Sequence, residues 1–186
     1  MQVKETGIEG LVEFIPNVFP DDRGWFFEFY KQETFRKLGL PESFPQENIS
    51  FSKKGVIRGL HFQRPPYAQG KLVTVIKGKV LDVVVDLREA SPTFGKVYYC
   101  VLDGEKHNML MVPEGFAHGF AALEESIFHY KCTNVYNKAH EGGIVWNDPD
   151  LKIEWPLDNP SVSDKDQHLP TFRELLRNSV ISQTLG

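Results

Sequence analysis

The chain has 186 residues, of which 41% are hydrophobic and 25% charged, and it carries a formal net charge of −4 at pH 7. That length suits one domain with a substantial buried core, and the acidic balance argues against a general nucleic-acid-binding surface. No segment approaches the roughly 18 apolar residues of a membrane span. The N-terminal segment MQVKETGIEGLVEFIP also lacks the apolar run of a signal peptide.

The cysteines are few, and Cys100 and Cys132 do not form a CxxC pair. They indicate neither a zinc site nor a disulfide framework. We therefore expect reduced thiols and a cytoplasmic protein, with neither nucleic acid nor membrane as a partner.

Short alternating runs of apolar and polar residues dominate the chain and predict many strands. Strands are expected over 11–19, 25–30 (after a turn at 20–24), 71–87, 95–103, 108–123 and 126–136. The first long run, 71–87, is interrupted by Lys77-Gly78-Lys79, which is typical of a hairpin turn.

Helical patterning is confined to two short stretches, 31–40, with Gly39 near its end, and 169–178. Strands with Gly and Pro turns between them favour a sandwich or jelly roll over an α/β fold. We expect a single all-β domain over 1–186, with short helices in the N-terminal third and at the C-terminus.

The stretch RGLHFQ, residues 58–63, places a histidine on a predicted strand. Alternation puts His61 on one face with Gly59 and Gln63, and Leu60 on the other face. Arg58 also falls on the opposite face from His61, although twist at the strand's beginning could still aim it at a site. A lone histidine of this kind is more often a core residue bonded to a backbone carbonyl than a functional group.

A second histidine lies in Pro113-x-Gly115-x-x-His118, which resembles the second signature of the cupin superfamily, a motif that lines the inside of a small β-barrel. Metal-binding cupins also carry a His-x-His pair, but the corresponding place here reads His61-Phe62-Gln63. A divalent metal usually takes at least three protein ligands. We therefore expect no metal and histidines that are free for proton chemistry.

Proton removal next to a ketone needs a base, a group that stabilises the enolate oxygen, and an acid on the opposite face of the carbon. His61 is a natural base near neutral pH, and Asp166 is a candidate to orient its ring. Lys71 is a candidate for the oxyanion, and Tyr130, with an ordinary pKa of about 10, for the acid. The last three also have a purely structural interpretation: Lys71 as a solvated lysine, Tyr130 as a core tyrosine and Asp166 as a turn aspartate.

Seven ordered segments across residues 8–167 together resemble the dTDP-4-dehydrorhamnose 3,5-epimerase family. They are DDRGWFFEFY, FPQENISFSKKGVIRGLHFQ, QGKLVTVIKGKVLDVVVDLR, VPEGFAHGFAAL, YKCTNVY, GGIVWNDPDLKIEWP and SDKDQ. The resemblance implies a cupin-type jelly roll (a double-stranded β-helix), a homodimer, and neither a metal nor an organic cofactor. It also implies epimerisation of dTDP-4-dehydro-6-deoxy-D-glucose at carbons 3 and 5, which gives dTDP-4-dehydro-L-rhamnose.

The resemblance also assigns roles to residues of this chain. His61 matches the family's base, Asp166 the carboxylate paired with it, Tyr130 the proton donor and Lys71 the cation near the carbon-4 oxygen. Asp82, on the polar face of its strand, is a candidate to orient His118 or Lys71.

The binding residues fall into three groups. The nucleotide end, partly across the dimer interface, matches Arg23, Phe26 and Glu28, and Tyr136 matches an aromatic that stacks on thymine. Sugar and diphosphate contacts match Gln46, Asn48 and Arg58. Further substrate contacts match His118, Glu141, Lys165 and Lys71.

Several alternatives stay open at this point. An epimerase that inverts only carbon 3 shares nearly all of these residues, so the motifs do not separate it from one that inverts both carbons. The intact RGLHFQ and YKCTNVY segments disfavour a cupin 3,4-ketoisomerase. From other classes, a metal-dependent cupin oxygenase and a non-catalytic sugar-binding module compete.

Overall fold

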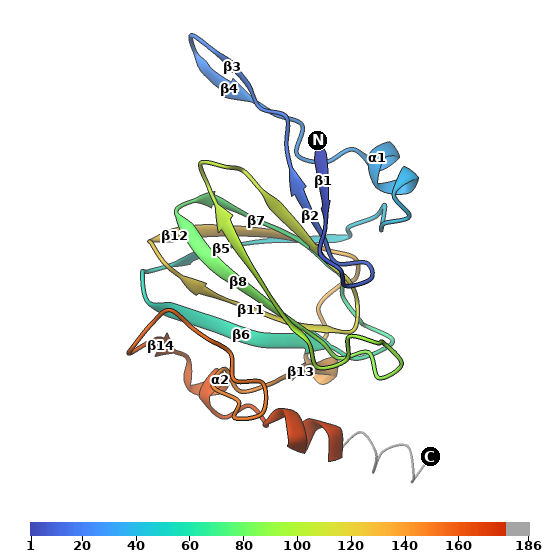
Figure 1. Ribbon diagram of the computed structural model, residues 1–186, viewed down its shortest axis with the longest axis vertical. Helices are drawn as coiled ribbons and strands as arrows, with labels where there is room; N and C mark the ends of the chain where they lie inside the picture. The colour runs from blue at the N-terminus through green and yellow to red at the C-terminus, as the bar shows by residue number, and fades with distance from the viewer. Residues whose placement is uncertain (178–186) are drawn as a thin grey trace.

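Two six-stranded β-sheets face each other in the computed structural model, which describes residues 1–177 (Figure 1). The first sheet has the order β1-β2-β10-β7-β12-β5, and its strands are Gln2–Glu5, Val12–Ile15, Met109–Val112, Lys71–Lys77, Ser126–Cys132 and Gln46–Ser52. The second sheet has the order β13-β6-β11-β8-β9, with strands Glu141–Gly143, Val56–Gln63, Phe116–Ala122, Lys79–Asp86 and Val97–Asp103. The sixth strand of this sheet is the short β14, Ser161–Val162, which pairs with β6 in parallel, outside that order. The predicted all-β jelly roll is confirmed.

The hairpin predicted at Lys77-Gly78-Lys79 is wrong. Strand β7 pairs with β10 and β12, whereas β8 pairs with β9 and β11, so the turn carries the chain from one sheet to the other. Gly78 has a φ of +84°, and a Cβ there would lie 2.2 Å from the carbonyl oxygen of Glu125. Only glycine fits this crossing, and the local turn signal does not determine which strands then pair.

The N-terminal region adds a small hairpin, β3 (Phe19–Asp21) with β4 (Gly24–Phe26), which projects from the body of the molecule (Figure 1). The strand predicted over 25–30 ends at Phe26. Phe29 and Tyr30 instead pack on the outer face of the first sheet, in a cluster that contains the buried Phe14 and Phe35.

The helices are short, as predicted. Helix α1, Gln32–Lys37, buries Phe35 and carries an acidic residue in its first turn and basic residues in its last, which complements the helix dipole. Gly39 follows with a φ of +68°. Near the C-terminus lie α2 (Asp164–Gln167) and a helical stretch over 172–177, while residue 178, the last of the helix predicted over 169–178, is outside the described residues. No helix within residues 1–177 is long and apolar enough to cross a membrane.

Three apolar clusters form the layers of the fold. The largest fills the space between the sheets with alternating side chains such as Val73, Val84 and Phe128. The second packs the outer face of the second sheet against the C-terminal segment, where Leu60 and Ile144 are fully buried. The third lies under α1. The inner cluster leaves a cavity between the sheets, and this cavity contains the polar residues described next.

Candidate active site

A bulge in β6 brings Arg58 and His61 to the same cavity. In the pairing of β6 with β11, His118 faces His61 and Phe120 faces Arg58, so β6 carries one extra residue between the two pairs. An extra residue reverses the alternation of side chains. The expectation that Arg58 and His61 lie on opposite faces is therefore wrong.

Glycine makes this bulge possible. Gly59 has a φ of +123°, and a Cβ there would lie 2.6 Å from the Cα of Gly119 on the neighbouring strand. Arg58 is held next to the cavity by hydrogen bonds from its guanidinium to Ser52 Oγ (2.9 Å) and to the carbonyl oxygen of Phe51 (3.0 Å).

His61 and Asp166 form a hydrogen-bonded pair. Nε2 of His61 lies 2.7 Å from Oδ1 of Asp166, whose Oδ2 accepts a second hydrogen bond from the Gly59 N–H at 3.1 Å. Burial alone would raise the pKa of Asp166, but these hydrogen bonds outweigh it and lower the pKa. A carboxylate only accepts, so the His61 proton lies on Nε2 and the other ring nitrogen is free to take a proton. The His61 side chain is 31% exposed and lines the cavity.

Lys71 and Tyr130 face this pair from the opposite sheet. Lys71 begins β7 and Tyr130 lies on β12, and the Lys71 ammonium is 6.0 Å from the centroid of the Tyr130 ring. The Lys71 ammonium makes no hydrogen bond or ion pair with any of residues 1–177, and burial lowers its pKa. Burial raises the pKa of Tyr130, which keeps its hydroxyl protonated.

Asp82 contacts His118, which is one of the two partners, His118 and Lys71, that the sequence suggests for it. Nε2 of His118 lies 2.8 Å from Oδ2 of Asp82, and both side chains are buried. The other carboxylate oxygen, Oδ1, has no hydrogen-bond partner in the described part of the chain. Each histidine of the site is thus paired with its own aspartate. Within residues 1–177, no group of three or more His, Cys, Asp or Glu side chains is placed to hold a metal ion.

Two cavities share His61, Lys71 and Tyr130 in their walls. The larger has a volume of about 530 Å³, and its polar lining includes Arg58, His61, Lys71, His118, Tyr130 and Asp166. The smaller has a volume of about 120 Å³, and Gln46, Asn48, Tyr136 and Glu141 line it with the shared residues. A ligand in the two cavities would therefore extend past all three shared side chains.

The smaller cavity has a connected set of polar contacts. Gln46 Nε2 donates to Asn48 Oδ1 (3.2 Å), and the Tyr136 hydroxyl donates to Glu141 Oε2 (3.1 Å). Lys165, which lines the larger cavity, donates to Glu141 Oε1 (2.6 Å) and so links the two. The pKa of Glu141 is lowered, because the hydrogen bonds from Lys165 and Tyr136 outweigh the effect of burial.

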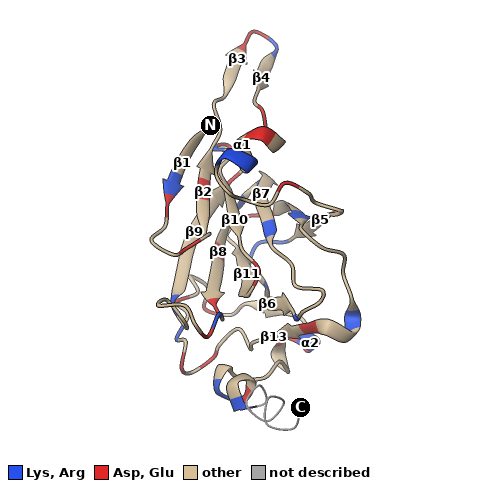
Figure 2. Cartoon of the chain, turned by 90° about the vertical axis from the view of Figure 1, so that its right-hand side faces the viewer, with Lys and Arg blue, Asp and Glu red and all other residues tan. Residues whose placement is uncertain are grey.

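Three predicted binding residues do not reach either cavity. Arg23 and Phe26 lie on the projecting hairpin and Glu28 just after it, and the hairpin's tip, which projects from the body, contains charged residues (Figure 2). Arg23 donates to Asp21 of the same hairpin, with a side chain 90% exposed. The other predicted site residues come together around the two cavities.

Sequence reasoning missed Ser163. Its hydroxyl caps α2 by accepting from the N–H of Asp166 (3.1 Å), and it lines the larger cavity. The spacing Ser-x-x-Asp resembles a helix-capping box, so the signal was present in SDKDQ. Because the cap fixes the first turn of α2, it also fixes the carboxylate that holds His61.

Comparison with known proteins shows the family of the chain. A family model described as dTDP-4-dehydrorhamnose 3,5-epimerase matches residues 5–174. The chain is 50% identical over 168 residues to a dTDP-4-dehydrorhamnose 3,5-epimerase of Shigella flexneri, which covers 89% of this chain and 93% of that protein.

Two solved structures are also similar. The crystal structure of dTDP-4-dehydrorhamnose 3,5-epimerase from Elizabethkingia anophelis NUHP1 is 46% identical, with a TM-score of 0.90 and coverage of 94% of this chain and 97% of that one. A 3′-monoepimerase from Streptomyces bikiniensis in complex with dTDP-quinovose is 34% identical, with a TM-score of 0.88 and coverage of 92% and 88%. Because the family model matches most of the chain and full-length relatives share up to half of its residues, this chain belongs to the dTDP-4-dehydrorhamnose 3,5-epimerase family.

Proposed function

We propose that this epimerase inverts carbons 3 and 5 of dTDP-4-dehydro-6-deoxy-D-glucose and gives dTDP-4-dehydro-L-rhamnose. Membership of the family supports the reaction class over an oxygenase, a ketoisomerase or a sugar-binding module. The single observation that carries the chemistry is the division of the site between the two sheets. His61 lies on the second sheet, and Tyr130 and Lys71 lie on the first, around one cavity.

This division suits a change of configuration. The ketone at carbon 4 acidifies the hydrogens on carbons 3 and 5. The free ring nitrogen of His61 takes such a proton, and Asp166 stabilises the imidazolium that forms. The electron pair left by the proton moves into an enolate, and the Tyr130 hydroxyl returns a proton to the carbon from the opposite side.

Lys71 stabilises the enolate oxygen in this mechanism. Its ammonium has no anionic partner at contact distance within residues 1–177, so the negative charge that develops on the carbon-4 oxygen would be its first. An interaction that forms mainly in the transition state lowers the barrier, whereas one already made in the ground state does not.

The rest of the nucleotide sugar fits the remaining residues. Arg58 suits the diphosphate, because a guanidinium can make paired bonds to phosphate oxygens. The smaller cavity suits the nucleotide end, with Tyr136 for the base and with Gln46 and Asn48 for sugar and diphosphate contacts. His118, Glu141 and Lys165 complete the walls.

Arg23, Phe26 and Glu28 enter the proposal through a second copy of the chain. Phe26 is 68% exposed on a hairpin that leaves the body of its own subunit. In a homodimer the hairpin would deliver these residues to the partner's nucleotide site. A cytoplasmic location is part of the same proposal and rests on the family and on the two free, buried cysteines.

Proton NMR of the product formed in deuterated water tests the proposal. Deuterium at both carbons 3 and 5 and an L-rhamno product are expected. The similarity to the 3′-monoepimerase supports a second candidate, inversion of carbon 3 alone. Deuterium at carbon 3 only would favour that candidate, and uptake at neither carbon would contradict both.

A further inference from the structure

Gln63 is a buried amide two residues from His61, and all its hydrogen bonds go to main-chain atoms of two loops. It is 6% exposed. Its Nε2 donates to the carbonyl oxygens of Tyr67 (2.7 Å) and Val135 (3.1 Å), and its Oε1 accepts from the N–H of Asn137 (2.7 Å). Both N–H donors and the oxygen of the amide are therefore used.

These bonds bracket Tyr136. Gln63 holds the residue before it through a carbonyl and the residue after it through an N–H. Val135 is 45% exposed and Tyr136 50% exposed, so this loop has little apolar packing to fix its position. A loop of this kind depends on hydrogen bonds to the rigid part of the fold.

Two further hydrogen bonds, made by Tyr136 itself, fix its position. Its N–H donates to Gln46 Oε1 (2.7 Å), and its hydroxyl donates to Glu141 Oε2 (3.1 Å). These bonds hold the ring at the wall of the smaller cavity. Binding to a ring that the protein's own contacts hold in place avoids the entropy cost of ordering the loop.

We propose that Gln63 is a positioning residue for nucleotide binding: it fixes residues 135–137 so that Tyr136 presents its ring to the base of the dTDP-sugar. This inference rests on the proposed function, because it requires the nucleotide end to occupy the smaller cavity. One strand then carries two separate functions, with proton transfer at His61 and nucleotide affinity at Gln63.

The test is Gln63→Met, which keeps the length of the side chain and removes its hydrogen bonds. We expect the Kd for dTDP, measured by titration calorimetry, to rise about tenfold, equivalent to about 1.4 kcal/mol. We expect KM for the nucleotide sugar to rise with it, and kcat to change less than about twofold, because residues 135–137 do not touch the reacting carbons. Asn134→Ala is the matched control. It removes an exposed hydrogen bond between the same two loops, from Nδ2 to the Pro66 carbonyl oxygen, and the bond that Oδ1 accepts from the adjacent Val135 N–H. It should change the Kd less than about twofold, because the bonds from Gln63 to Val135 and Asn137 remain.

A double-mutant cycle with Tyr136→Ala separates positioning from general damage. If Gln63 acts through Tyr136, the double variant binds dTDP no more weakly than Tyr136→Ala alone. Additive losses of affinity, an unchanged Kd in Gln63→Met, or a fall in kcat as large as the rise in KM would overturn the proposal. Tyr136→Ala with unchanged dTDP affinity would instead overturn the nucleotide placement on which the proposal depends. If Gln63→Met does not fold, Gln63→Glu gives the same readouts, because it keeps the acceptor for Asn137 and sets an oxygen against two carbonyl oxygens.

Discussion

Two aspartates on the same face of β8 have opposite surroundings. Asp82 and Asp86 alternate with Val80 and Val84, which face the space between the sheets, and both aspartates are fully buried. Asp86 accepts five hydrogen bonds, whereas Asp82 has one partner, His118, and an oxygen without one in the described residues. The same residue type stabilises the fold at one position and leaves bonding capacity unused beside the cavity at the other.

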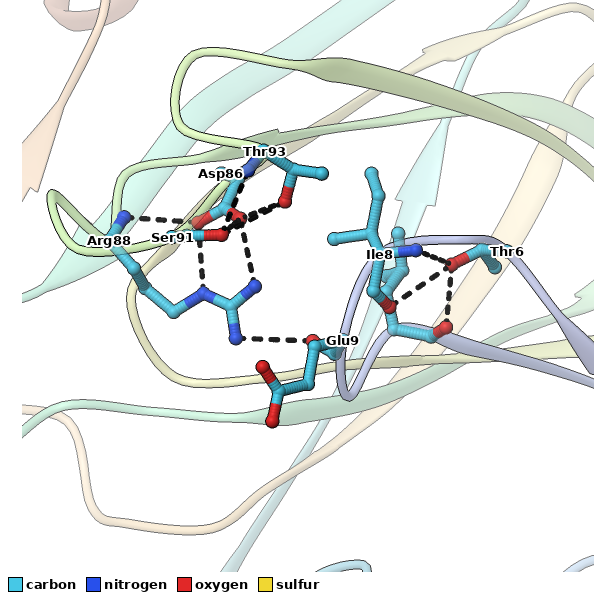
Figure 3. A network of polar contacts seen from close by, with 8 residues as sticks. Thr6, Ile8, Glu9, Asp86, Arg88, Ser91 and Thr93 are labelled. Atoms are coloured by element: carbon cyan, nitrogen blue, oxygen red, sulfur yellow. Dashed lines mark hydrogen bonds and ion pairs between the residues drawn. The ribbon is translucent and has the colours of Figure 1, made fainter.

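The network around Asp86 joins the end of β8 to two loops (Figure 3). Its carboxylate accepts from the N–H and guanidinium of Arg88 and from the hydroxyls of Ser91 and Thr93. Arg88 also donates to the Glu9 carbonyl oxygen and stacks over Phe116, with its central carbon 4.6 Å from the ring centroid. Burial alone would raise the pKa of Asp86, but these bonds outweigh it and place the pKa well below its usual range.

The site around Asp82 differs, because its charged groups lack a full set of hydrogen-bond and ion-pair partners. Lys71 has a lowered pKa and no ion pair in residues 1–177. Such an arrangement costs stability and is retained where a bound substrate supplies the missing partner. We therefore expect mutations around Asp86 to change stability and mutations around Asp82 to change the rate of catalysis.

Lys71→Met should have the largest effect. We expect kcat to fall about 10²–10³-fold, as for the loss of one oxyanion donor. Stability should increase, because the change removes an unpaired ammonium; about 1 kcal/mol corresponds to a Tm about 2–4 °C higher for a chain of this size. Steady-state kinetics and calorimetry measure the two quantities. A variant that keeps its rate, or that is less stable than wild type, would contradict the comparison.

Asp86→Asn should have the opposite effect, a loss of stability without a loss of kcat. It weakens the charge-assisted bonds from Arg88, which should lower the free energy of unfolding by about 1.5–3 kcal/mol, with kcat unchanged well below the Tm. Urea titrations measure the loss. Asp82→Asn is the matched control on the same strand and face, and it should cost less than half as much, because Asp82 has one hydrogen bond. Equal costs at the two positions would remove the distinction.

The loss of the free energy of unfolding at acidic pH is a smaller and more specific effect. The native pKa of Asp86 lies below its unfolded value of about 3.9, so its stabilisation is fully present above that value and is lost as pH falls through the native pKa. Wild type should therefore lose free energy of unfolding more steeply than Asp86→Asn as the pH falls from about 4 towards 2. Parallel curves for the two proteins would show that Asp86 is not the source of the slope.

The sequence predicted which residues line the cavities better than how the strands place them. Alternation along RGLHFQ correctly put His61 and Leu60 on opposite faces: Leu60 is buried in the cluster on the outer face of the second sheet, whereas His61 lines the cavity. It misplaced Arg58, because a bulge depends on the close approach of Gly59 and Gly119 across two strands, which no local pattern encodes. The same reason explains the error at Gly78, where contacts with a distant turn decide the path. Gln63 stands where metal-binding cupins carry a second histidine. Its proposed role depends on the two loops it binds, and the loop that contains Tyr136 is distant from it in the sequence.

In the proposed mechanism His61, oriented by Asp166, removes the protons at the carbons that are inverted. Deuterium uptake by the nucleotide sugar in deuterated water tests it most directly, with wild type and His61→Ala compared at saturating substrate and dTDP affinity measured for both. We expect uptake at carbons 3 and 5 in wild type, and none at either carbon in His61→Ala, with the Kd for dTDP retained. Undiminished uptake by His61→Ala at either carbon would show that His61 is not the base.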